Sequence, residues 1–256
     1  MGGPPATTSL SNSARLDVIA TRISIAAAPF CDTHVKMDLV DGQEVKRCSY
    51  PWRLAAAKGV NAKADGKSIA INADLLDFVA SDDEVALVFG HELAHNTMHH
   101  LDKQRGNAIL GTVAGVLVSA ALGVNVGGAF SQIGRGMYSQ SFEAEADYVG
   151  VYYAALAGYD YHGAAAFMRR MGAEHPQAIS HGSSHPPTAE RYVALEKAAR
   201  EIDGKIARGE PLIPNGVELA GRDRAQSSSM AQSSSEPISA TPPPGEDSYS
   251  HGVPGR

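Results

Sequence analysis

The sequence predicts an α+β fold that is mainly α-helical, with a small β-sheet beside one buried helix. Several segments carry apolar residues at helical spacing. An Asp-Gly pair separates two short alternating segments, which is typical of a β-hairpin. One helix start is marked by a capping box and followed by apolar residues on most sides. With 256 residues, 43% of them apolar, the chain is long enough for one sizeable core.

The first element expected is an amphipathic helix over residues 16–30, with Leu16, Ile19 and Ile23 on its apolar face. Residues 1–14 lack the basic segment and apolar run of a signal peptide, so an exported protein would have lost its leader before this sequence begins. Cys31 and Cys48 are the only two cysteines and frame a segment rich in turn formers and charge. This spacing favours one disulfide in an oxidising compartment, and two reduced thiols in a cytosolic protein are the alternative.

The hairpin is expected from residues 60–64 and 67–72, which flank Asp65-Gly66. A short helix follows near residues 75–79. Ser81 and Glu84 form the capping box of the buried helix, which we expect to run to about residue 100. Further helices are expected over residues 139–157, 161–172 and 187–208. From residue 221 onward Ser, Pro and Gln dominate, so this part is predicted to be disordered.

The buried helix carries the motif that suggests chemistry, His91-Glu92-Leu93-Ala94-His95. Histidines four residues apart share one helix face and can bind one tetrahedral zinc ion. Glu92 follows the first ligand, so it is placed to hold the water on the metal and to take its proton. The alternative is a helix with two surface histidines, which the apolar neighbours of the motif disfavour.

A third protein ligand is needed. His99 shares a face with His91 but lies about 12 Å away along a continuous helix. We therefore interpret His99 and His100 as helix-end residues, where a histidine suits the helix dipole.

Two carboxylates further along the chain are better candidates, because Glu143 and Asp147 stand one turn apart on one helix face. Glu143 can bind the metal, and Asp147 can accept the second N–H of a ligand histidine. Glu145 points away from this face by about 200°. The alternative is an acidic surface helix, which the apolar neighbours of these carboxylates disfavour.

Four segments in this order resemble the gluzincin endopeptidases, a group that includes the HtpX heat-shock proteases and the CAAX prenyl endopeptidases. The resemblance is greatest to the soluble periplasmic BepA-like and mitochondrial OMA-like members, and it covers about residues 60–206. The segments are Val60-Asn61-Ala62, Gly90-His91-Glu92-Leu93-Ala94-His95, Phe142-Glu143-Ala144-Glu145-Ala146-Asp147 and Ser184-His185-Pro186-Pro187-Thr188-Ala189-Glu190-Arg191.

The resemblance implies a zincin-like metallopeptidase core with one zinc ion per chain. Its metal ligands would be His91, His95 and Glu143, and its general base Glu92. The resemblance also places His185 and Arg191 at the active site. His185 would then donate to the oxyanion or take the fourth zinc position, and Arg191 would pair with a nearby carboxylate. The alternative for His185-Pro186 is an ordinary turn before a helix.

Residues 108–130 are uncharged and about long enough for one membrane span. A single span would place His95 and Glu143 on opposite sides of about 30 Å of hydrocarbon. We therefore expect this segment to be a lid, a plug, or a surface that touches a membrane or a partner.

The expected reaction is hydrolysis of peptide bonds in polypeptides, with misfolded or envelope proteins as substrates. The strand near residues 67–72 is expected to be an edge strand that receives the substrate backbone. The formal net charge of −6 indicates no nucleic-acid partner. A catalytically silent, metal-binding chaperone-like protein and a non-peptide metal hydrolase are the rival hypotheses.

The predicted organisation is an N-terminal helix and cysteine loop over residues 1–50, a zinc metallopeptidase domain over residues 51–215 and a disordered tail over residues 216–256. The expected location is the bacterial periplasm or another exported compartment. Peripheral membrane contact, contact with an envelope protein, and homo-oligomer formation are left open.

Overall fold

The computed structural model describes residues 11–106, 138, 140–174, 185, 188–217, 219 and 220. The predictions for residues 108–130 and for the tail beyond residue 220 therefore fall outside the described residues.

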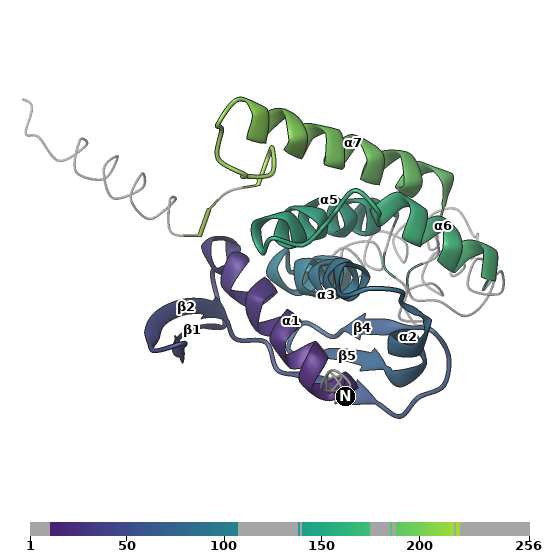
Figure 1. Ribbon diagram of the computed structural model, residues 1–256, viewed down its shortest axis with the longest axis horizontal. Coiled ribbons are helices and arrows are strands. Elements are labelled where there is room, and N and C mark those ends of the chain that lie inside the picture. Colours follow the sequence, from purple (N-terminus) through teal and green to yellow (C-terminus); the bar gives the residue numbers. More distant parts are fainter. Residues whose placement is uncertain are drawn as a thin grey trace, which may run out of the picture. The chain divides into compact units, whose positions relative to one another are not determined.

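The central element is α3 (Asp82–Thr97), which lies between a small β-sheet on one side and α5 (Gln140–Leu156) on the other (Figure 1). Its start is the predicted capping box: the Ser81 side chain accepts the Glu84 N–H at 3.3 Å, and the Glu84 carboxylate accepts the Ala80 N–H at 2.7 Å. Most of α3 is buried, because other elements cover it on several sides. The predicted buried helix is therefore confirmed, although it ends at Thr97.

The sheet beside α3 has the strand order β3 (Trp52–Ala55), β5 (Ile69–Asn72), β4 (Ala62–Ala64). β4 and β5 form the predicted hairpin, in which the Asp65 carboxylate accepts the N–H groups of Lys67 and Ser68 at 2.9 and 2.6 Å. The expectation that residues 67–72 form an edge strand is wrong. β5 is central, because β3 pairs with it in parallel on its other side. Among the strands of the described residues, β4 is at the edge that packs against α3.

A second hairpin lies in the segment that the sequence suggested was a loop. β1 (Val35–Val40) and β2 (Gln43–Cys48) pair antiparallel through Asp41 and Gly42. Both turn residues have positive φ, 49° and 79°, as a two-residue hairpin turn requires. Cys31 and Cys48 are joined in the predicted disulfide, with their Cα atoms 5.9 Å apart.

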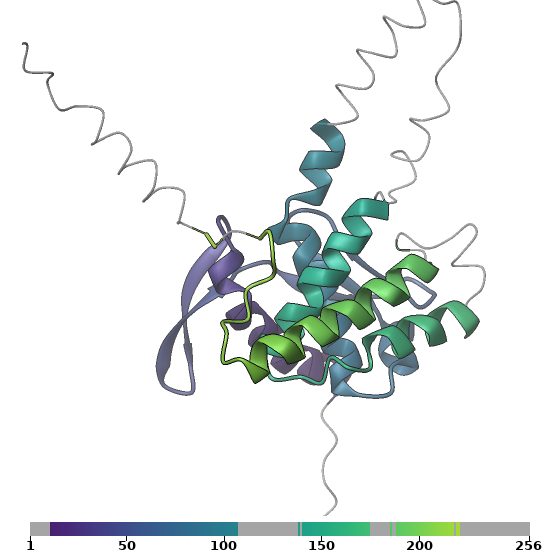
Figure 2. The ribbon, with the colours of Figure 1, turned by 90° about the horizontal axis from the view of Figure 1, so that it is seen from above.

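The remaining helices complete one core. α1 (Asn12–Ala26) packs on α3 and α5, and the 3₁₀ turn η1 (Ala28–Phe30) follows it. α2 (Ala73–Phe78) continues directly from β5. α7 (Ala189–Ala207) lies across α5 and beside α6 (Ala164–Glu174), as Figures 1 and 2 show. The core includes side chains from all layers, among them Leu16, Ile23, Ile69, Leu93, Tyr152 and Ile202.

The helix predicted near the N-terminus thus shares its core with the motif helix. The domain boundaries at residues 50 and 215 stay predictions. None of the helices formed by the described residues combines the length and the apolar character needed to cross a bilayer.

Candidate metal centre

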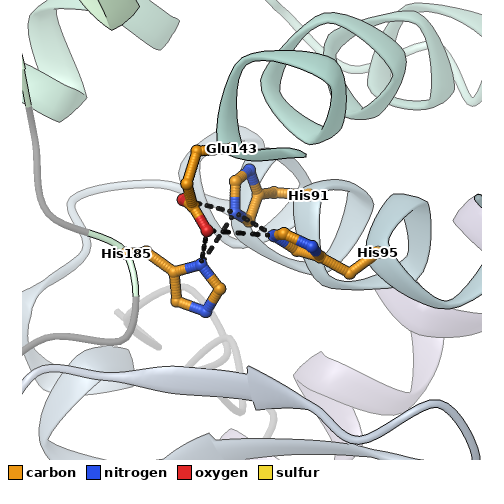
Figure 3. Close-up of side chains that lie close together, drawn as sticks. All are labelled: His91, His95, Glu143 and His185. Carbon is orange, nitrogen blue, oxygen red and sulfur yellow. Dashed lines mark hydrogen bonds and ion pairs between the residues drawn. The ribbon is translucent and has the colours of Figure 1, made fainter. Parts of the chain in front are cut away.

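Four side chains that the sequence singled out meet at one point between α3, α5 and the segment before α7. His91 and His95 come from α3, Glu143 from the first turn of α5, and His185 from the segment before α7 (Figure 3). One nitrogen or oxygen atom of each lies within 4.8 Å of the others.

The spacing of these atoms fits a tetrahedral ion. The Nε2 atoms of His91 and His95 are 3.1 Å apart, and each lies 3.4–3.6 Å from a Glu143 oxygen. His185 Nδ1 is 2.8 Å from Glu143 Oε1 and 3.3 Å from His91 Nε2. Ligands bound to zinc at about 2.0–2.1 Å are separated from one another by about 3.3–3.4 Å in a regular tetrahedron. Three imidazoles and one carboxylate are also a donor set that zinc accepts.

Two glycines allow the helices that carry these side chains to approach closely. Gly90 on α3 faces Gly150 on α5, and a Cβ atom added to either would lie 2.7 Å from backbone of the other helix. No side chain separates the two backbones at this point. Consequently His91, one residue after Gly90, is held close to the carboxylates of α5.

His91 is fixed from behind by a buried ion pair. Its Nδ1 atom lies 2.9 Å from Asp147 Oδ1, so Nε2 points to the centre of the cluster. Arg191 donates to both oxygens of Asp147 at 2.6 and 2.7 Å, and its Nη1 lies 3.0 Å from Glu143 Oε2. Without a metal, burial opposes the charged form of His91, but the hydrogen bonds to Asp147 and Glu143 raise its pKa to about 10, so a metal would have to displace the proton on Nε2. These are the contacts that the sequence suggested for Asp147 and Arg191.

Glu143 stays ionised despite its burial. Removal from water raises the pKa of a carboxyl group, but His185, His91 and His95 outweigh this and hold the pKa of Glu143 well below its usual range. A carboxylate in this state can bind a metal ion.

His95 has a partner that the sequence did not predict. Its Nδ1 atom is 2.9 Å from Nδ1 of His100, whose Nε2 is 3.1 Å from Glu145 Oε2. The interpretation of His100 as a helix-end residue is wrong, because α3 has already ended at Thr97 and His100 is completely buried. Burial lowers the pKa of His95 well below its usual value, so its imidazole is neutral, as a ligand must be.

Glu92 lies beside the four donors without being one of them. It is 2% exposed, and its Oε1 is 3.3 Å from His185 Nε2. Its Oε2 has no hydrogen-bond partner among the described residues. A buried carboxylate oxygen with this freedom can hold a water next to the metal position.

Tyr138 covers the other side of the cluster, and nothing in the sequence indicated this. Its ring stacks on that of His95, with centroids 3.8 Å apart, and its hydroxyl donates to the Ala64 carbonyl of β4 at 2.9 Å. It therefore connects the edge strand to the metal-ligand candidates.

An apolar cavity opens next to His91 and Glu92. It reaches from residues 60–62, just before and within β4, to α6 and α7. Its walls include Leu87, Val88, Val151, Ala164, Phe167 and Met168. A cavity of this kind suits a large apolar side chain of a bound molecule.

Comparison with known proteins agrees with this geometry. The model of the family described as peptidase family M48 matches residues 35–199. A candidate beta-barrel assembly-enhancing protease of Vibrio cholerae is 29% identical over 161 residues, which cover 56% of this chain and 33% of the relative.

Two similar proteins are named mitochondrial metalloendopeptidase OMA1. The one from Arabidopsis thaliana is 32% identical over 51% of this chain and 27% of its own length. The one from Schizosaccharomyces pombe is 26% identical over 60% of this chain and 48% of its own length. The chain thus spans less than half the length of these relatives.

Proposed function

Because the chain belongs to peptidase family M48, we propose that it is a zinc-dependent endopeptidase. The resemblance inferred from the four sequence segments is confirmed by this membership. In the proposal His91, His95 and Glu143 bind the metal and Glu92 is the general base. One observation carries it: four donors lie at the spacing of a tetrahedral zinc site, directly beside a buried carboxylate that is not a donor.

When bound, zinc would polarise the peptide carbonyl and make a nearby water more acidic. Glu92 would accept a proton from that water at a carboxylate oxygen and deliver it to the leaving amine. Asp147 would hold the proton on His91 Nδ1, so that the Nε2 lone pair stays directed at the metal. Arg191 would keep Asp147 and Glu143 ionised and in place.

His185 Nδ1 lies 2.8 Å from Glu143 Oε1 and 3.3 Å from His91 Nε2, so in the proposal it would stand at the fourth corner of the zinc tetrahedron. An imidazole at this corner takes the position that the water needs. This supports a regulatory role, in which His185 silences the site as long as its imidazole stays at this position. The rival role is donation to the oxyanion of the tetrahedral intermediate.

The proposed substrates are polypeptides in a non-native or extended state. Apart from the Ala64 carbonyl, which accepts from Tyr138, the edge that β4 presents among the described residues can receive an extended backbone. The adjacent cavity can receive a large apolar side chain, which folded proteins bury. The Cys31–Cys48 disulfide favours an oxidising compartment, such as the bacterial periplasm. Together with the name of the Vibrio relative, this supports misfolded or envelope proteins as substrates.

The deciding experiment measures cleavage of an unfolded protein and zinc content in three proteins: wild type, Glu92→Gln and Glu143→Gln. We expect cleavage by the wild type that a chelator abolishes. Glu92→Gln should keep near-stoichiometric zinc and lose nearly all hydrolysis, whereas Glu143→Gln should lose the zinc. The opposite pattern of zinc retention would show that the ligand assignment is wrong.

The same assay separates the rival hypotheses. A silent chaperone-like protein would bind the unfolded protein and zinc without cleaving it. A non-peptide hydrolase would leave the polypeptide uncut but hydrolyse small esters in a chelator-sensitive way.

A further inference from the structure

We propose that His100 and Glu145 are positioning residues for His95, and that this pair sets the zinc affinity of the site. The proposal rests on the metal site of the proposed function. It assigns a role to two residues outside the four metal-ligand candidates, and neither would touch the metal or the substrate.

His100 and Glu145 form a continuous hydrogen-bonded chain with His95. His95 Nδ1 and His100 Nδ1 are 2.9 Å apart, and His100 Nε2 is 3.1 Å from Glu145 Oε2. His95 is 1% exposed and His100 is completely buried, so water cannot replace either contact. Glu145 is half-buried and ends this hydrogen-bonded chain near the surface.

The position of each proton in this hydrogen-bonded chain follows from the metal site. His95 must present the lone pair of Nε2 to the metal, so its proton is on Nδ1. That N–H can only donate to His100 if Nδ1 of His100 is unprotonated. The proton of a neutral His100 is then on Nε2, where it donates to the Glu145 carboxylate. Each partner therefore requires the tautomer that leaves His95 ready to bind zinc.

A break in the helix brings His100 to this place. Five residues along a continuous helix would turn His100 about 140° away from His95. Instead α3 ends at Thr97, and His99 adopts a left-handed conformation with φ 54°. The chain is helical again over residues 100–106. The His100 ring then stacks on Phe142 of α5, with centroids 4.7 Å apart.

The left-handed conformation of His99 is stabilised by a contact of its side chain. His99 Nε2 lies 3.0 and 3.1 Å from the two oxygens of Asp32, the residue after Cys31 of the disulfide. A left-handed histidine costs free energy, and such a conformation persists only where its surroundings enforce it. Thus the N-terminal part of the chain helps to aim His100 at His95.

The two histidines proposed as ligands are consequently oriented by different pairs of residues. His91 is backed by Asp147 and Arg191, and His95 by His100 and Glu145. Loss of an outer partner of a metal-bound histidine typically weakens metal binding by about 10–100-fold. A His100 that only filled space would leave zinc affinity unchanged when replaced by a ring of similar size.

The test measures zinc affinity by competition with a chromophoric chelator, in the full chain and without any substrate. His100→Phe keeps an aromatic ring against Phe142 but removes both nitrogens. We expect it to bind zinc about 10–100-fold more weakly than the wild type. Glu145→Gln, which keeps a hydrogen-bond acceptor but removes the charge, should show a smaller loss.

Two further variants make the result specific. His100→Gln retains an acceptor and a donor and should recover part of the affinity lost in His100→Phe. His162→Phe is the matched control, because His162 also contacts carboxylates, Asp160 and Asp203, but lies on the surface. It should bind zinc like the wild type. Thermal unfolding of the metal-free proteins verifies that each variant is folded at the temperature of the binding assay.

The outcomes separate this inference from the proposed function. If the wild type binds no zinc, the metal site itself is wrong. If the wild type binds zinc and the folded His100→Phe variant binds it equally well, the positioning role is refuted. Should His100→Phe fail to fold, Glu145→Gln decides: wild-type affinity in that variant overturns the proposal.

Discussion

The contact between Gly90 and Gly150 predicts that a single methyl group between the backbones of α3 and α5 will damage the proposed metal site. In Gly150→Ala the new Cβ atom would lie 2.7–2.9 Å from His91 N, His91 Cα and Gly90 C. All three are backbone atoms of α3, so no side chain can rotate away. The two helices must therefore move apart.

The size of the movement follows from these distances. An ordinary van der Waals contact begins at about 3.4 Å, so α3 and α5 must separate by about 0.7 Å. The gap between His91 Nε2 and Glu143 Oε2, now 3.6 Å, would widen by a similar amount, because these atoms belong to the same two helices. Metal–ligand distances tolerate only about 0.2 Å. We expect zinc affinity to fall by at least 10-fold and overpacking to cost about 1–3 kcal/mol of stability.

Zinc competition and thermal unfolding of the metal-free protein measure both effects. Gly204→Ala is the matched control, since Gly204 is also helical but its new Cβ would meet only the flexible end of Arg208. Alanine is a better helix former than glycine by about 0.5–1 kcal/mol, so the control should be as stable as the wild type or more stable. Wild-type zinc affinity and unchanged stability in Gly150→Ala would refute the reasoning.

Three more predictions concern His185, the apolar cavity and the carboxylate of Glu201, which lies outside the metal site. His185→Ala should raise peptidase activity, because His185 would no longer block the fourth position on the metal. A fall in kcat of about 10²–10³-fold would instead identify His185 as an oxyanion donor, and unchanged activity and zinc affinity would show that it is only a turn residue. Ala164→Leu should fill part of the cavity, lowering kcat/KM for peptides with Leu or Phe next to the cleaved bond by about 10–200-fold while sparing those with Ala; equal losses for both would contradict the assigned cavity. Glu201, which accepts hydrogen bonds from the hydroxyls of Tyr148 and Tyr152 at 2.7 and 2.6 Å, has a pKa below its usual value: burial raises it, but these hydrogen bonds outweigh burial. The ionised Glu201 side chain therefore stabilises the fold at pH values above its unfolded pKa, and this stabilisation is lost as the pH falls through the folded pKa. Urea unfolding should show Glu201→Gln to be less stable than the wild type by about 1–2 kcal/mol at pH 7, with the difference shrinking below about pH 4. A difference in stability that does not depend on pH would contradict this.

Local sequence patterns were sufficient for the features that depend on one helix or one turn. His91 and His95 share a face because four residues make about one helical turn, and Glu143 and Asp147 do so for the same reason. The capping box and the Asp65-Gly66 turn are also local, since their hydrogen bonds join residues at most four apart. The Asp41-Gly42 hairpin carried the same local signal, and it was missed because the surrounding charge suggested a loop.

Residues 185 and 191 were a different case. Their place near the metal could be expected only from resemblance, because nothing in their own neighbourhood specifies it. Their partners Glu143 and Asp147 are more than 40 residues away in the chain.

Only the tertiary structure decided the features that depend on contacts between separate elements. The central position of β5 in its sheet depends on its pairing with β3, whose residues precede their partners in β5 by 17 positions in the chain. The role of Gly90 depends on Gly150 lying opposite it, and that of His100 on a helix break that no propensity marks. The sequence by itself determined which side chains can act together within one helix, because backbone geometry fixes their spacing. Which helices bring those side chains to a common point is decided by packing, since the same local patterns are compatible with many arrangements of the core.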